Sequence, residues 1–295
     1  MKRREFIINT TAASIPLFLP SKGLSLQQRY KFGLQLFTLN REMNDDPIGT
    51  LKIVQKIGFE DCELFGFDGE KQSFYGIGAK DFKKIMEDHS LTASSGHFGF
   101  APYFDHPDDA LLRFTDQCIQ GAHELGMSYV TWPFLSTEHR SMSNFLKLTN
   151  KLNKIGKRVK QAGLSFAYHN HGFEFIEYNS VTGYDLILNE TDPELVKLQL
   201  DIYWVIHSSK YTPKQLIKKH PGRFTMWHIK DMDKVSKDYT ELGNGSIDYT
   251  SILPDPVQSG MEYYYLEQGG NFAHSAVKSV EESALYFERH LKKYF

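Results

Sequence analysis

Acidic and histidine side chains stand near the ends of neighbouring apolar runs in the second half of the chain. Residues 196–204 contain Asp201, residues 224–231 contain His228, and residues 261–267 end in Glu267. Carboxylates and imidazoles are ligands that suit Mn, Zn, Mg or Co. If these runs are consecutive strands of one sheet, the three side chains can converge on a single ion. The spacing therefore predicts one divalent metal ion, held by Asp201, His228 and Glu267.

A metal in such a place predicts proton-transfer chemistry. The ion would polarise a carbonyl or hydroxyl group, and a nearby base would remove a proton from the adjacent carbon. His171 shares a strand face with His169 and is the leading candidate for that base, with the orientation of a ligand as the alternative role. Glu267 is predicted to act as ligand and base together. Lys230 is predicted to hold a substrate oxygen or stabilise negative charge, and the alternative is an ion pair with an acidic neighbour.

The elements that position these residues alternate between strand-like and helix-like segments. Eight strands are predicted at residues 32–37, 59–67, 91–97, 129–134, 164–171, 196–204, 224–231 and 261–267. Helical segments are predicted at residues 46–58, 79–89, 107–125, 143–162, 184–189, 213–219, 249–253 and 275–291. Eight such units predict an α/β protein with one (β/α)8 TIM barrel domain over residues 30–295. A doubly wound sheet is disfavoured, because no G-x-G-x-x-G turn follows the first strand.

In such a barrel the active site lies at the carboxyl ends of the strands. Glu63 and His97 fall at the ends of the second and third predicted strands, so they are predicted to contact substrate. Trp132, Phe134, Tyr203 and Trp204 are predicted to form apolar walls against a sugar. Structural hydrogen bonds are the alternative role for Glu63 and His97, and core packing is the alternative for the four aromatic residues.

Four motifs together resemble the xylose-isomerase-like TIM barrel superfamily, which includes sugar phosphate isomerase/epimerases, inosose dehydratases and AP endonuclease family 2. They are Tyr168-His169-Asn170-His171-Gly172-Phe173-Glu174-Phe175, Leu200-Asp201-Ile202-Tyr203-Trp204, Gly222-Arg223 followed by His228-Ile229-Lys230-Asp231, and Leu266-Glu267-Gln268. The resemblance covers about residues 30–295, and the His-x-Lys-Asp run is its most specific part.

This resemblance implies a metal held by a carboxylate of the fifth strand, an Asp of the sixth, a His of the seventh and a Glu of the eighth. Asp201, His228 and Glu267 match the last three. His169 stands where the fifth strand would carry Glu, so the fourth ligand is His169 or, from the following loop, Glu174; position favours His169. The departure weakens simple C3 epimerisation, in which two metal-bound glutamates exchange the proton.

The predicted function is therefore a divalent-metal-dependent isomerase or epimerase acting on a sugar or cyclitol. One alternative is a lyase or hydrolase that cleaves a 3-keto-glycoside by β-elimination, because a ketone acidifies the neighbouring C–H bond. A second alternative is a sugar-binding barrel without catalytic activity. All three predict a small carbohydrate as the partner.

The first 25 residues predict export. Arg3-Arg4-Glu5-Phe6 precedes an apolar stretch, residues 7–20, that is shorter than the roughly 20 apolar residues of a membrane span. The pattern resembles a twin-arginine signal and predicts a periplasmic protein without a stable membrane span in its mature form. An ordinary N-terminal helix and a retained membrane anchor are the alternatives. Without residues 1–25 the chain keeps 30 basic and 35 acidic residues, a balance that disfavours nucleic acid as a partner.

Overall fold

A closed barrel of eight parallel strands forms the centre of the computed structural model, which describes residues 30–295. The predicted export signal lies outside the described residues. Around the barrel the strands follow one another in the order β1 (Gly33–Gln35), β15 (Tyr263–Leu266), β12 (Met226–Ile229), β11 (Lys197–Asp201), β8 (Ser165–His169), β7 (Tyr129–Trp132), β6 (Thr92–His97) and β2 (Asp61–Leu64). This confirms the predicted single-domain (β/α)8 TIM barrel.

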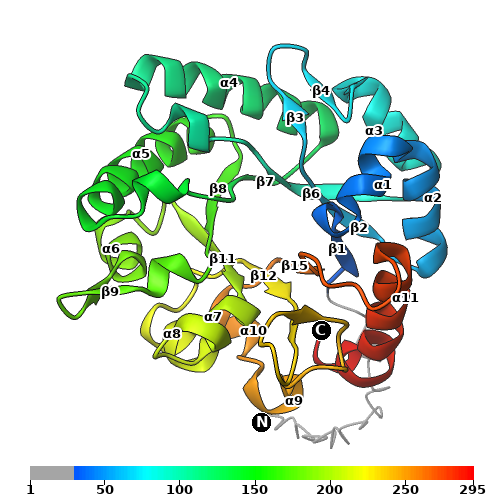
Figure 1. Ribbon diagram of the computed structural model, residues 1–295. Helices are drawn as coiled ribbons and strands as arrows, with labels where there is room; N and C mark the ends of the chain where they lie inside the picture. Colours follow the sequence, from blue (N-terminus) through cyan, green and yellow to red (C-terminus); the bar gives the residue numbers. More distant parts are fainter. Residues whose placement is uncertain (1–29) are drawn as a thin grey trace, which may run out of the picture.

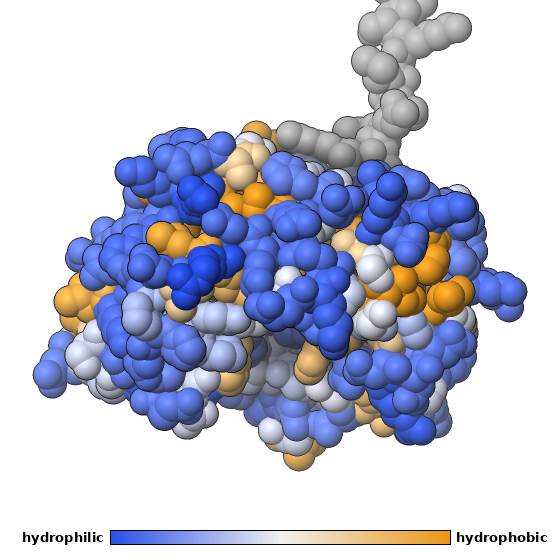
Figure 2. All heavy atoms as spheres, turned by 90° about the horizontal axis from the view of Figure 1, so that it is seen from above, coloured by the Kyte–Doolittle hydropathy of each residue, from blue (hydrophilic) through white to orange (hydrophobic). Residues whose placement is uncertain are grey.

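Helices form a ring around the strands (Figure 1). They are α1 (Asn40–Asp45), α2 (Pro47–Ile57), α3 (Ala79–Asp88), α4 (Asp108–Leu125), α5 (Met142–Gln161), α6 (Gly183–Glu190), α7 (Ile202–Ser208), α8 (Pro213–Lys219), α9 (Tyr249–Ile252), α10 (Pro256–Ser259) and α11 (Ala276–Tyr286). Within residues 30–295, no helix has the length and apolarity needed to cross a membrane. The face in Figure 2 is largely hydrophilic, with apolar groups in separate patches.

Local signals account for most helix boundaries. Asp46 caps α2 by accepting a hydrogen bond from the Gly49 N–H, and Pro47 opens the first turn, where its missing N–H costs nothing. Gly58 ends this helix with φ of 112°, a conformation that favours glycine. Helix α6 begins with a capping box between Thr182 and Asp185.

The sixth predicted strand is wrong at its carboxyl end. Strand β11 stops at Asp201, and Ile202 starts α7, because the Asp201 side chain accepts a hydrogen bond from the Trp204 N–H and caps the helix. Tyr203 and Trp204 therefore belong to a helix.

Small antiparallel sheets extend several of the loops that follow barrel strands. They are β3 (Phe67–Asp68) with β4 (Ser73–Phe74) and β5 (Ile77–Gly78), β9 (Glu177–Tyr178) with β10 (Val181–Thr182), and β13 (Asp231–Met232) with β14 (Tyr239–Thr240). These loops lie beyond the carboxyl ends of β2, β8 and β12, the end where a barrel carries its active site.

Candidate functional site

Four side chains from adjacent strands gather at the carboxyl end of the barrel. His169 ends β8, Asp201 ends β11, His228 lies in β12, and Glu267 follows β15. One potential ligand atom from each lies within 4.8 Å of those of the others. The barrel register explains the grouping, since Asp201 pairs with His228 across β11 and β12. The structure thus brings together the three predicted ligands and His169, the favoured candidate for the fourth.

Glu174 lies outside this group. Its Oε1 accepts a hydrogen bond from the Tyr168 hydroxyl and its Oε2 from the His171 N–H, both at 2.8 Å. Burial raises the pKa of Glu174 to about 7, although these hydrogen bonds oppose the rise. Glu174 is therefore engaged in holding the turn after β8, and His169 has the better position for the fourth ligand.

Lys230 is the cation of the group. Its Nζ lies 2.7 Å from Asp201 Oδ2 and 2.7 Å from Glu267 Oε2. Burial alone would lower the pKa of Lys230, but the two carboxylates raise it above its ordinary value. The residue therefore carries its charge inside the protein, compensated by two acidic partners.

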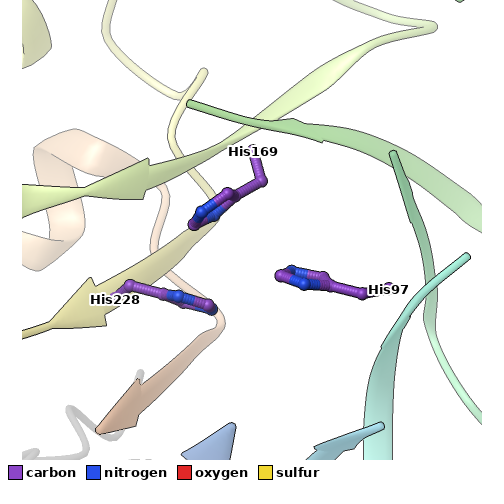
Figure 3. Close-up of side chains that lie close together, drawn as sticks. All are labelled: His97, His169 and His228. Atoms are coloured by element: carbon purple, nitrogen blue, oxygen red, sulfur yellow. The ribbon is translucent and has the colours of Figure 1, made fainter. Parts of the chain in front are cut away.

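Three imidazoles point toward one another in the same region (Figure 3). The ring centres of His169 and His228 are 4.6 Å apart, and that of His97 lies 5.0 Å from His169 and 5.5 Å from His228. His97 Nε2 lies 2.8 Å from Gln199 Oε1, which can only accept, so this nitrogen carries a proton. The Nδ1 of His169 has no hydrogen-bond partner in the described part of the chain.

Glu63 lies beneath these rings. Its Oε2 is 2.6 Å from His228 Nε2 and 3.1 Å from His97 Nε2, and its side chain is fully buried. Gln35, Ser95 and Gln199 each donate a further hydrogen bond of 2.6–2.7 Å to its carboxylate. The structure thus places Glu63 against predicted site residues and away from the cavity that a substrate would enter.

The charges in this group support one another. Burial favours the neutral forms of both Glu63 and His228. Even so, the imidazoles of His97 and His228 hold the pKa of Glu63 well below its usual range. Glu63 and Glu267 in turn raise the pKa of His228 to about 9. The two carboxylates therefore favour the protonated form of the imidazole, and binding of a metal at His228 would displace one of its protons.

A cavity of about 440 Å³ opens onto the group, which is large enough for a sugar. Its wall includes five of the predicted polar site residues: His97, His169, His171, Lys230 and Glu267. Burial and the charge of Lys230 lower the pKa of His171 to about 3, so its imidazole is neutral at pH 7.

Of the predicted wall residues, Phe134 lines the cavity, and Trp132, Tyr203 and Trp204 do not. Trp132 is fully buried, stacks on Phe100 with ring centres 5.2 Å apart, and donates its Nε1–H to the Phe134 carbonyl. Tyr203 is on α7, and its hydroxyl donates to the Lys237 carbonyl. Neither lines the cavity. Core packing explains the position of Trp132, and the early end of β11 explains that of Tyr203.

Other residues of the site were missed. Gln35 and Gln199 join the Glu63 network, and Phe37 and Tyr239 line the cavity. The sequence contains a signal for the two glutamines. Gln199 shares a strand face with Asp201, and Gln35 lies near the end of the first strand. Tyr239 comes from the β13–β14 hairpin, whose strands of two residues leave no clear pattern.

The group fits a divalent cation. Two imidazoles and two carboxylates form a ligand set typical of zinc and manganese. The Nδ1 of buried His169 has no hydrogen-bond partner in the described chain, so this nitrogen is available as a metal ligand. The pairing of His228 with Glu63 matches the carboxylate that commonly supports a metal-bound histidine.

The chain belongs to the xylose isomerase-like TIM barrel family, whose model matches residues 51–264. It is 28% identical over 222 residues to an inosose dehydratase of Clostridium botulinum, covering 64% of this chain and 73% of that protein. A solved sugar phosphate isomerase/epimerase from Parabacteroides distasonis is 27% identical, with a TM-score of 0.75, covering 91% of this chain and 96% of that one. The IOLI protein with a bound zinc atom has a TM-score of 0.70 at 16% identity, covering 90% and 99%.

Proposed function

We propose that this protein is a metal-dependent lyase that removes the proton next to the carbonyl of a sugar or cyclitol and then expels the substituent on the following carbon. The observation that carries the proposal is the single carboxylate on the cavity wall. Among residues 30–295, Glu267 is the only acidic residue that lines the cavity, because Asp201 is fully buried. The symmetric exchange of a proton between two carboxylates therefore has no second partner here.

His169, Asp201, His228 and Glu267 would hold the metal. When bound, it would polarise the substrate carbonyl and acidify the neighbouring C–H bond. Zinc in the IOLI protein supports a metal of this kind. The name of the Clostridium botulinum relative, a dehydratase, supports elimination as the outcome.

The chain's own residues supply the remaining steps. The neutral imidazole of His171 takes the proton from carbon, and the C–H electron pair forms a double bond as the β C–O bond breaks. The same imidazole returns its proton to the departing oxygen, so the products are an unsaturated ketone and water or an alcohol. Lys230 holds the oxygen on which negative charge develops.

Isomerisation or epimerisation is the second candidate, favoured by the name of the Parabacteroides distasonis structure. It begins with the same proton abstraction, but the proton returns to carbon.

Incubation of the metal-loaded protein with an inosose and with 3-keto-glucosides in D₂O separates these outcomes. Elimination releases water or an alcohol and forms an unsaturated ketone, which NMR detects. Isomerisation leaves the substituent in place and introduces deuterium into recovered ketone. No conversion with Mn, Zn, Mg or Co would reject both reactions and favour a sugar-binding barrel. Glu267→Gln is the matched inactive variant.

A further inference from the structure

The cavity wall divides into two chemically different halves. Strands β8, β11, β12 and β15 are contiguous in the barrel. His169 ends β8, Lys230 follows β12 and Glu267 follows β15, and all three line the cavity. The other contiguous strands, β1, β2, β6 and β7, carry His97 at the end of β6 and are otherwise followed by the apolar side chains of the wall. These are Phe37 after β1, Phe65 and Phe67 at and beyond the end of β2, and Pro133 and Phe134 after β7.

Two of these phenylalanines are exposed. Phe37 is 43% and Phe134 39% exposed, and they are the only exposed phenylalanines in residues 30–295, a region that contains 20 of the 22 in the sequence. All the others are at least partly buried. Phenylalanine rings left open at the mouth of one cavity indicate a surface that a ligand covers.

Away from the histidine and carboxylate group, the cavity wall carries no cationic side chain within the described chain. Lys230 is the only lysine or arginine on the whole wall within the described chain, and both Asp201 and Glu267 neutralise it. Arg140 lies near the mouth, with its Cζ 3.8 Å from the Phe173 ring centre and 5.0 Å from that of Phe134, but it does not line the cavity. A phosphate group is normally held by free guanidinium or ammonium groups, and the wall away from Lys230 offers none.

We infer that the cavity accepts an uncharged glycoside, with its reacting sugar at the histidine and carboxylate group and a second ring against Phe37 and Phe134. A ring with an apolar face would cover the two phenylalanines, and the absence of a free cation disfavours a sugar phosphate. The inference rests on the proposed function, in which this second ring belongs to the group that is expelled.

Calorimetric titration of the full chain in the presence of zinc tests the inference with unoxidised probes. Glucose, galactose and mannose are each offered as the methyl glycoside, the phenyl glycoside and the 6-phosphate of the methyl glycoside. Because these probes have no ring ketone, they are not turned over and binding is measured apart from reaction. The phenyl glycoside of the accepted sugar should bind about tenfold more tightly than its methyl glycoside, and the 6-phosphate no more tightly than the methyl glycoside.

Phe37→Ala and Phe134→Ala should each remove most of the phenyl preference while leaving methyl glycoside affinity within about threefold. Leu146→Ala, which truncates another exposed apolar side chain that does not line the cavity, is the control and should keep the preference. Tighter binding of a 6-phosphate, a phenyl preference that survives both phenylalanine variants, or no binding of any phenyl glycoside would each overturn the inference. If the protein converts no ketone but still prefers the phenyl glycoside, only the proposed reaction is rejected.

Discussion

Glu63 orients His228, which belongs to the group proposed to bind the metal, through a hydrogen bond to its Nε2. A carboxylate that accepts from His228 Nε2 leaves Nδ1 to face Glu267 and the proposed ion. Glu63→Gln keeps the size of the side chain but places an amide NH₂ among the donors Gln35 and Gln199. We expect metal affinity to fall about 10- to 100-fold, the usual effect of losing a partner of a metal-bound histidine. Titration with zinc and manganese, followed by calorimetry, measures the change.

Ser95→Ala is the matched control for this variant. It removes one hydrogen bond to Glu63 Oε1 and leaves the contact with His228 intact, so metal affinity should change far less. A Glu63→Gln protein that binds metal as tightly as the unaltered protein would show that Glu63 has only a packing role.

Glu174 should make stability depend on pH. Its pKa of about 7 in the folded protein exceeds the ordinary value of 4.5, so the folded state retains a proton that the unfolded state has released. This stabilising contribution is fully present below about pH 4.5 and is lost as pH rises through about 7. Glu174→Gln is neutral throughout, so its unfolding free energy should fall less between pH 6 and pH 8 than that of the unaltered protein.

Urea unfolding at the two pH values tests this, with Glu177→Gln as the control because Glu177 is exposed and pairs with Lys210. The difference between variants isolates Glu174 from other titrating groups. Identical pH dependence in Glu174→Gln and the unaltered protein would mean that the buried carboxyl titrates normally.

At the scale of single residues, the sequence predicts which polar side chains reach the barrel end but not their depth. Strand alternation correctly groups His228 with Lys230 on one face, and both meet Glu267 in the structure. Glu63 satisfies the same pattern yet lies below the rings, because depth depends on the stagger between strands. Contacts such as that between Glu63 and Gln199, 136 residues apart, have no local signature.

Asp201 links two elements, and its two oxygens have separate tasks. Oδ1 caps α7, whereas Oδ2 pairs with Lys230 in the proposed ligand group. Asp201→Asn and Asp201→Ala both remove the charge, but only Asn keeps an oxygen for the cap. We expect both variants to lose metal binding and Asp201→Asn to retain about 1 kcal/mol more unfolding free energy. Urea unfolding with EDTA gives this comparison, and equal values for the two variants would contradict the capping role.

Among the elements, those with strong signals were predicted and those without were not. Helix α2 combines Asp46, Pro47 and Gly58, and its predicted and observed ends agree closely. The extension of β11 to Trp204 was predicted because Ile202, Tyr203 and Trp204 favour strands, yet the Asp201 cap prevails. The short hairpins were missed, since two residues per strand cannot show alternation.

For the whole molecule, the ligand group connects distant parts of one domain. His169 and Glu267 are nearly 100 residues apart, and the four residues belong to adjacent strands of a closed barrel. An ion bound there requires the folded barrel, so a metal at about 100 times its Kd should stabilise the fold by about 2.7 kcal/mol. For a domain of this size that corresponds to a rise in Tm on the order of 5–10 °C.

Scanning calorimetry with EDTA and with added zinc, manganese, magnesium or cobalt measures this rise. His228→Ala should abolish it, whereas His123→Ala, which removes an exposed histidine from α4, should preserve it. Because the barrel is closed and every strand that carries a ligand pairs with its neighbours, the bound metal should raise the Tm of a single cooperative unfolding transition. A Tm that no metal changes would reject the ligand group, and a shift equally large in His228→Ala would place the bound ion elsewhere on the molecule.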